Sequence, residues 1–170
     1  MNQITQNAQI HPFPGSNVQA ESEMEELVTF VIDGQMFGVS ALKVRDVLRQ
    51  QPLTAIPLAP PEIAGTMNLR GHIVTALNMR ARLGLPAAAE NQRTMCVVAE
   101  HGGDQFCLIV DAVGDVLSLP RAKIEANPAA LGDTWADLCK GIYRLEDRLL
   151  LILNIPRLLV FEARPESSRA

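Results

Sequence analysis

The chain has 170 residues, 48% of them hydrophobic and only 4% aromatic, so we expect one domain or two small subdomains around an aliphatic core. A formal net charge of −4 provides no broad basic field and argues against nucleic acid as the main partner. Three widely spaced cysteines without a CxxC pair, and the lack of any apolar run of membrane-spanning length, favour a reduced cytoplasmic protein that is not inserted in a membrane.

The first third of the chain passes from a polar tail into a predicted β-hairpin. Residues 1–24 are rich in Asn, Gln, Pro, Ser and acidic side chains and predict a flexible tail. Apolar runs at 27–32 and 35–39 predict two strands, joined by Asp33-Gly34, a pair that tolerates positive φ. A serine then precedes residues 41–47, where we expect a short helical turn.

The middle of the chain begins with four prolines in residues 52–61, which predict an extended and irregular crossing. Two apolar runs at 63–69 and 72–77 follow and predict a pair of strands. A short helix is expected at 79–83, where a glycine and a proline end it. The small and polar residues 86–93 then predict a boundary between two subdomains.

The last part of the chain again favours strands. We predict them, with a hairpin turn at His101-Gly102-Gly103-Asp104 and another at Glu146-Asp147, at residues 94–100, 105–110, 113–119, 138–145 and 148–153. A closing helix is expected at about 155–161, followed by a loose end at 163–170. Residues 106–110 are apolar on both sides of the strand, so both faces must pack on something. Eight to ten short strands with brief helices indicate a mainly β protein, built as one or two small barrels.

Four stretches resemble the CheW family of chemotaxis adaptors: LVTFVIDGQMFGVSALKVRDVLR at 27–49, IPLAPPEIAGTMNLRG at 56–71, FCLIVDAVGDVLSLP at 106–120 and GIYRLEDRLLLILNIPRLL at 141–159. The resemblance runs through most of the chain and implies a CheW-like domain at 25–162. It implies two five-stranded β-barrel subdomains packed on a shared aliphatic core, with no catalytic residues, cofactor or metal. It also implies a non-enzymatic adaptor that couples the cytoplasmic tips of chemoreceptors to the histidine kinase CheA.

The resemblance also suggests where the partners bind. It implies receptor contact by Val44, Asp46, Gly65 and Arg70, and kinase contact somewhere within 94–153 through the regulatory domain of CheA. Other CheW-like domains are further candidate partners, and the protein is expected to be recruited to receptor arrays. A charged arginine between two apolar runs must find a carboxylate or carbonyls, or face a partner. We therefore hypothesise that Asp46 and Arg70 form an ion pair at this surface.

Simpler structural roles remain open for several residues. Arg70 could instead fix two strands, Val44 could belong to the core, and Asp46 could be solvated. Asn78 stands where many relatives carry an acidic residue, which weakens the assumption that the usual polar network surrounds Arg80. Structural roles are also expected for the following residues: Arg80 and Arg82 on a solvated helix face, Asp111 and Asp115 in a solvated bend, Trp135 as a surface anchor or a cover of the core, and His72 and His101 without a metal.

Three rival functions follow from the same residues. The chain could be part of a CheV-like protein without its receiver domain, or serve motility, biofilm or development in place of swimming. An enzyme is a second rival, although no P-loop, GxGxxG, GxSxG or HExxH motif is present. A third is a scaffold that assembles with its own copies, because strands that are apolar on both faces could pair between molecules.

Overall fold

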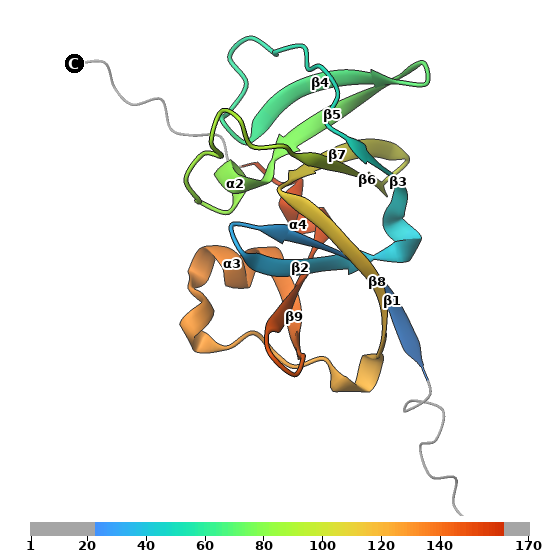
Figure 1. The fold of residues 1–170 in the computed structure, drawn as a ribbon, viewed down its shortest axis with the longest axis vertical. Coiled ribbons are helices and arrows are strands. Elements are labelled where there is room, and N and C mark those ends of the chain that lie inside the picture. Colours follow the sequence, from blue (N-terminus) through green and yellow to red (C-terminus); the bar gives the residue numbers. More distant parts are fainter. Residues whose placement is uncertain (1–22, 162–170) are drawn as a thin grey trace, which may run out of the picture.

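The computed structural model describes residues 23–161, and the strands in this part of the chain form two five-stranded sheets (Figure 1). Sheet A has the order β8 (Ala112–Pro120), β1 (Met24–Ile32), β2 (Gln35–Ser40), β10 (Leu149–Leu153), β9 (Cys139–Arg144). Sheet B has the order β3 (Val44–Arg49), β6 (Met95–His101), β7 (Asp104–Val110), β5 (His72–Asn78), β4 (Ile63–Leu69). The short helical segments are η1 (Ala41–Lys43), α2 (Met79–Arg82), η2 (Arg121–Lys123), η3 (Ala129–Leu131), α3 (Asp133–Leu138) and α4 (Ile155–Leu158). The prediction of a mainly β protein with two five-stranded units is confirmed.

The two halves of the described chain repeat one pattern. Each half contains a hairpin, a crossing strand, a second hairpin and a short helix, as β1 to β5 with α2 and then as β6 to β10 with α4. The second hairpin of each half lies beside the first hairpin of the other half. The adjoining strands are parallel, with β10 beside β2 and β5 beside β7. The first hairpins of the two halves are exchanged: β1 and β2 lie in one sheet with β8, β9 and β10, whereas β6 and β7 lie in the other with β3, β4 and β5.

This exchange corrects the predicted subdomain boundary at 86–93. That segment separates the two halves of the sequence. However, it connects α2, which directly follows β5 of sheet B, to β6, which is a strand of the same sheet. The chain passes between the sheets at η1 and again between β7 and β8. The low hydrophobicity of residues 86–93 therefore marks a connection within sheet B and not a boundary between subdomains. Strand pairing, and not position in the chain, decides which sheet each segment joins.

Each sheet curls until its two edges nearly meet, without closing into a full barrel. A single bridge joins Thr54, which follows β3, to Thr66 in β4, and a second joins Glu125, which follows β8, to Ile142 in β9. A glycine precedes the bridging residue in both edge strands. A Cβ at Gly65 would lie 2.5 Å from the carbonyl oxygen of Thr54, and one at Gly141 would lie 2.8 Å from that of Glu125. Close backbone approach thus explains both glycines.

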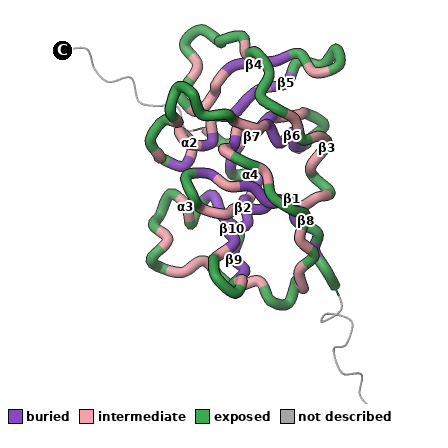
Figure 2. The backbone as a smooth tube through the Cα atoms, viewed as in Figure 1, coloured by how far each residue is buried: buried purple, intermediate pink, exposed green. Residues whose placement is uncertain are grey.

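The main core lies where the two sheets meet, and both contribute to it (Figure 2). Strands that are apolar on both faces divide their side chains between this core and the interior of their own sheet. Leu108 packs between the sheets, whereas the preceding Cys107 packs inside sheet B with Met67 and Val74. Leu151 and Leu150 divide in the same way on the side of sheet A. The expectation that both faces must be covered is confirmed, and the other sheet supplies the cover.

Three hairpins turn through two residues that both have positive φ, namely Asp33-Gly34, Arg70-Gly71 and Gly102-Gly103. Such turns match the twist of the flanking strands. The predicted hairpin at Glu146-Asp147 is also present, since β9 and β10 are antiparallel neighbours. No helix within residues 23–161 has the length and apolar character needed to cross a membrane.

Three predicted boundaries need correction. The helical turn expected at 41–47 is confined to η1, because Val44 already begins a strand that pairs with β6. Residues 1–22 of the predicted tail lie outside the described residues, but Met24 is part of β1, and the carboxylate of Glu25 is nearly buried and lies 3.2 Å from the ammonium of Lys140. The closing helix α4 ends at Leu158. The loose end expected at 163–170 also lies outside the described residues.

Candidate functional site

A bulge in the edge strand β3 shapes the first side of the candidate site. Val44 lies opposite Ala99, but Asp46 lies opposite the preceding residue of β6, so Arg45 is the extra residue. Bulges redirect side chains and are frequent near functional sites. Here Arg45 reaches Glu100 with an Nε to Oε2 distance of 2.6 Å, and the Oδ1 atom of Asp46 accepts from the amide of Val47 at 2.8 Å.

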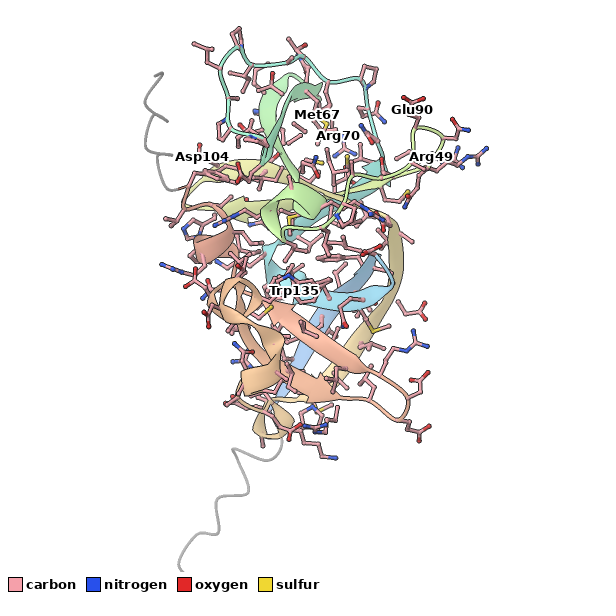
Figure 3. The ribbon with its side chains drawn as sticks, turned by 90° about the vertical axis from the view of Figure 1, so that its left-hand side faces the viewer. Arg49, Met67, Arg70, Glu90, Asp104 and Trp135 are labelled. Carbon is pink, nitrogen blue, oxygen red and sulfur yellow. The ribbon has the colours of Figure 1, made fainter. Side chains whose placement is uncertain are left out.

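The turn between β4 and β5 supplies the second side. Arg70 is the first of its two central residues and has a φ of 52°, and Gly71 follows with a φ of 85°. The side-chain oxygen of Asn68 accepts from the amide of Gly71 at 2.9 Å. The motif NLRG therefore encodes a tight turn with an arginine at its tip. Figure 3 shows Arg70 on the sheet above the level of Trp135.

The hypothesised ion pair between Asp46 and Arg70 is confirmed. Arg70 Nη2 lies 3.0 Å from Asp46 Oδ2, although the two residues belong to opposite edges of sheet B. The pair can form because the sheet curls until those edges approach. The Arg70 side chain remains 79% exposed, whereas that of Asp46 is 25% exposed. Most of the guanidinium is thus open to a partner while the carboxylate holds its position.

A small hollow of about 260 Å³ surrounds this pair. Its lining combines charged, amide and apolar side chains: Arg45, Asp46, Leu69, Arg70, His72, Val98 and Gln105. Val44 lies outside the hollow and packs partly buried against the core between the sheets. Gly65 lies farther along β4 against Thr54. Of the four predicted receptor residues, the structure brings two together directly and gives Val44 and Gly65 packing and backbone roles.

Several residues of the hollow were missed by sequence reasoning. Arg45 lines the hollow and pairs with Glu100 because of the bulge, which leaves no signal in the sequence. Gln105 could have been found, because the predicted hairpin at His101-Gly102-Gly103-Asp104 places residue 105 opposite residue 100, as observed. His72 directly follows the Arg-Gly turn and could have been included on that ground.

The structure corrects the interpretation of Arg80, which does not lie on a solvated helix face. Its guanidinium donates to both carboxylate oxygens of Asp111, at 3.0 and 2.6 Å, and to the carbonyl of Pro86 at 2.9 Å. The Arg80 and Asp111 side chains are each 13% exposed, and Asp33 lies 3.6 Å from the guanidinium. Burial favours the neutral acid, but the bonds from Arg80 and from the Asp33 amide outweigh it, so the pKa of Asp111 lies below its ordinary value.

Asn78, the departure noted in the sequence, has a local explanation. Its side-chain oxygen accepts from the amide of Ala81 at 3.2 Å and so caps α2. Asn154 caps α4 in the same manner, with the amide of Arg157 as donor at 3.3 Å. The network around Arg80 is built on Asp111, so it does not require a carboxylate at residue 78.

Arg82 and Trp135 also have structural roles. Arg82 donates to the carbonyls of Arg157, Leu158 and Val160 at the end of α4, at 2.9, 3.0 and 2.7 Å. Its guanidinium also lies 5.4 Å from the ring centroid of Phe161. Trp135 covers the core, since its ring packs on Phe37 and its indole N–H donates to the carbonyl of Leu83. The expected solvated face for Arg82 is therefore wrong.

Neither aspartate lies in a solvated bend as predicted, since Asp115 is exposed but belongs to strand β8, and Asp111 is held in the Arg80 network. Among residues 23–161 there is no group of three or more His, Cys, Asp or Glu side chains that could hold a metal ion.

Comparison with known proteins identifies the family. The family model described as CheW-like domain matches residues 26–162 of this chain. The chain belongs to the CheW-like domain family. Chemotaxis protein CheW of Rhizobium meliloti (strain 1021) is 30% identical over 139 residues, covering 82% of this chain and 90% of the relative. Chemotaxis protein CheW of Klebsiella aerogenes is 28% identical over 147 residues, covering 86% of this chain and 89% of the relative.

A solved CheW structure has the same fold. The crystal structure of the scaffolding protein TtCheW from Thermoanaerobacter tengcongensis matches with a TM-score of 0.71 and 27% identity, covering 78% of this chain and 90% of that chain. The resemblance noted in the sequence is therefore confirmed. This CheW-like protein is a chemotaxis scaffold or adaptor, and not an enzyme.

Proposed function

We propose that this CheW-like protein couples the cytoplasmic tips of chemoreceptors to the histidine kinase CheA within a chemosensory array. It acts without a chemical step, by presenting one surface to the receptor and another to the kinase. Two sheets that share one core form a rigid support for such surfaces. The observation that carries the proposal is the mostly exposed arginine held on a carboxylate at the curled edge of sheet B.

The receptor-binding surface in this proposal is centred on Asp46 and Arg70. The exposed guanidinium can donate to carboxylates or helix-terminal carbonyls of a receptor helix, and arginine often dominates the energy of such contacts. Val44, two residues from Asp46 on β3, would add apolar area. Gly65 contributes indirectly by keeping β4 against Thr54. A transient signalling interface of this kind buries on the order of 1,200 Å² or less.

The kinase-binding surface is proposed to lie within residues 94–153, where it would dock the regulatory domain of CheA. Other CheW-like domains are proposed as further neighbours in the array. The protein would then be cytoplasmic and recruited to receptor arrays. Its output follows from how it fixes the kinase relative to the receptor.

A binding experiment with purified proteins tests the receptor surface. A cytoplasmic chemoreceptor fragment is titrated into the full chain and into its Arg70→Ala and Asp46→Asn variants, with Arg148→Ala as the matched control. Arg148 is also a surface arginine near a hairpin turn and pairs with a neighbouring carboxylate, that of Asp147. We expect Arg70→Ala to lose about tenfold in affinity, or about 1.4 kcal/mol, and Arg148→Ala to bind as the parent does.

Kinase activation in reconstituted receptor and CheA mixtures provides the second readout. The parent chain should increase kinase activity, and Arg70→Ala should reduce the increase at equal concentration. Light scattering of the isolated chain separates coupling from self-assembly. If the isolated chain forms large assemblies and binds neither the receptor fragment nor CheA, the coupling proposal is wrong.

A further inference from the structure

The three two-residue hairpin turns differ in their first central residue, although all have positive φ at both positions. Two of them use residues that tolerate this geometry, Asp33-Gly34 and Gly102-Gly103. The third places Arg70 at a φ of 52°. A left-handed backbone costs about 1–2 kcal/mol per residue for an ordinary side chain. An arginine in this position indicates that its side chain is kept for a purpose other than turning the chain.

Asn68 supports this unusual turn from outside its two central residues. Its side-chain oxygen accepts from the amide of Gly71 at 2.9 Å and so holds the far end of the turn. The bond fixes the peptide group that directly follows Arg70. That position of the backbone places the guanidinium 3.0 Å from the carboxylate of Asp46. The attraction within an ion pair weakens as the two charges separate, so a rotation of the turn that carries the guanidinium away from Asp46 weakens the pair.

We infer that Asn68 is the positioning residue of the receptor site: its amide holds Arg70 in a left-handed turn and thereby directs the guanidinium onto Asp46 and toward the receptor. The inference rests on the proposed function for the binding role of Arg70. It adds a residue that does not line the hollow around the pair. It also explains why the turn contains an arginine where the other two hairpins use aspartate or glycine.

Receptor binding by Asn68 variants tests the positioning role. With the same receptor fragment, Asn68→Ala should lose about tenfold in affinity, or about 1.4 kcal/mol. Asn68→Asp should remain close to the parent, because its carboxylate can accept from the Gly71 amide in the same way. The double variant Asn68→Ala with Arg70→Ala should bind no more weakly than Arg70→Ala alone, since both changes remove the same contact. Parent-like affinity of Asn68→Ala, beside a weakened Arg70→Ala, would overturn the inference and leave the proposed function intact.

Two measurements without receptor separate failure of the inference from failure of the proposed function. The NMR resonance of the Arg70 side-chain Nε–Hε group should shift when Asp46 is changed to Asn, and this response should vanish in Asn68→Ala. The urea midpoint of unfolding should fall for Asn68→Ala, but by much less when residue 70 is glycine, which needs no support in this turn. Equal losses with arginine and glycine at residue 70, or an unchanged NMR response, would show that Asn68 only stabilises the hairpin. If Arg70→Ala binds normally, the receptor role fails, and these two measurements still decide the positioning role.

Discussion

Arg80 donates hydrogen bonds to both carboxylate oxygens of Asp111. This pair connects α2, beside sheet B, to the point where the chain crosses into sheet A. Asp111 also accepts from the amide of Asp33 at 2.7 Å, and its own amide donates to the carbonyl of Val31. One carboxylate therefore connects the first hairpin, the crossover and the helix α2. Arg80 and Asp111 are 31 positions apart, so no local pattern in the sequence predicts their contact.

Replacement of Asp111 by asparagine should change the acid limb of the stability curve. The carboxyl of Asp111 has a folded-state pKa below its ordinary value of 3.8, so folding favours the ionised form. Its contribution is complete above about pH 5 and is lost as the pH falls below 4 toward the folded-state pKa. We expect Asp111→Asn to be less stable than the parent at pH 7, with the difference narrowing as the pH falls through this window. Urea unfolding at pH values from 3 to 7 measures it.

An exposed carboxylate provides the control for this pH series. Asp115 lies on β8, four residues beyond Asp111, and its side chain is exposed. Asp115→Asn should follow the parent at every pH. A constant difference between Asp111→Asn and the parent over the whole range would contradict the assigned role of the ionised carboxylate.

Alanine at residue 65 should destabilise the protein. Gly65 has a φ of 145°, and an added Cβ would lie 2.5 Å from the carbonyl oxygen of Thr54. The backbone strain and the clash together should cost about 2 kcal/mol or more, which lowers Tm by roughly 6–8 °C for a domain of this size. Differential scanning calorimetry gives the change. Gly71→Ala is the comparison, because its φ is also positive but the space around it is open; a larger loss there would contradict the close-approach argument.

The pair of Asp46 and Arg70 should contribute little to folding. Because the arginine is mostly exposed, solvent and salt screen the interaction, and pairs of this kind contribute about 0.2–1 kcal/mol. Asp46→Asn should therefore leave Tm within roughly 3 °C of the parent. Thermal unfolding at low and high salt checks both points, since the small difference should shrink further at high salt. A large loss of stability would assign the pair to the fold instead of to binding.

Removal of the Arg82 guanidinium should reduce the protection of residues 155–161 from hydrogen exchange. Three carbonyls at the end of α4 would lose their donor, and the aromatic contact with Phe161 would also be lost. Hydrogen exchange of the peptide covering residues 155–161 should become faster in Arg82→Ala, whereas exchange in β6 and β7 should not change. Arg82→Lys should recover only part of the protection, because an ammonium group cannot reproduce the planar fork of donors.

The three cysteines should not react with thiol reagents in the folded protein. Cys96, Cys107 and Cys139 are all buried and free, and burial raises the pKa of Cys139 to about 12. The thiolate is the reactive species, so ionisation is unfavourable for Cys139, and burial restricts the access of reagents to all three thiols. At pH 8 we expect negligible reaction with a chromogenic disulfide reagent, and three reactive thiols per chain in denaturant. Rapid reaction of any one thiol in the native state would contradict its burial.

Local sequence signals were sufficient for most strands and turns. The pairs Asp33-Gly34 and Gly102-Gly103 predict their hairpins, because few other residues tolerate positive φ at both central positions of a two-residue turn. The runs at 63–69 and 72–77 became β4 and β5 with nearly the predicted limits. Even the apolar character of both faces was informative, since it required a second layer to cover the strands.

Interactions between distant parts of the chain could not be read in this way. The exchange of the first hairpins depends on pairing of β3 with β6 and of β1 with β8, which are far apart in the sequence, so composition at 86–93 indicated the wrong kind of boundary. Arg80 and Arg82 resemble solvated helix residues until Asp111 and the end of α4 are placed beside them. The pair of Asp46 and Arg70 was anticipated only because family resemblance joined two segments that local patterns leave separate.

The exchange of the first hairpins has a consequence for how this chain can be divided. A cut between residues 83 and 94 would leave two fragments, each holding two strands of one sheet and three strands of the other. Such fragments could acquire the native architecture only by assembling with each other, as the subunits of an obligate heterodimer do.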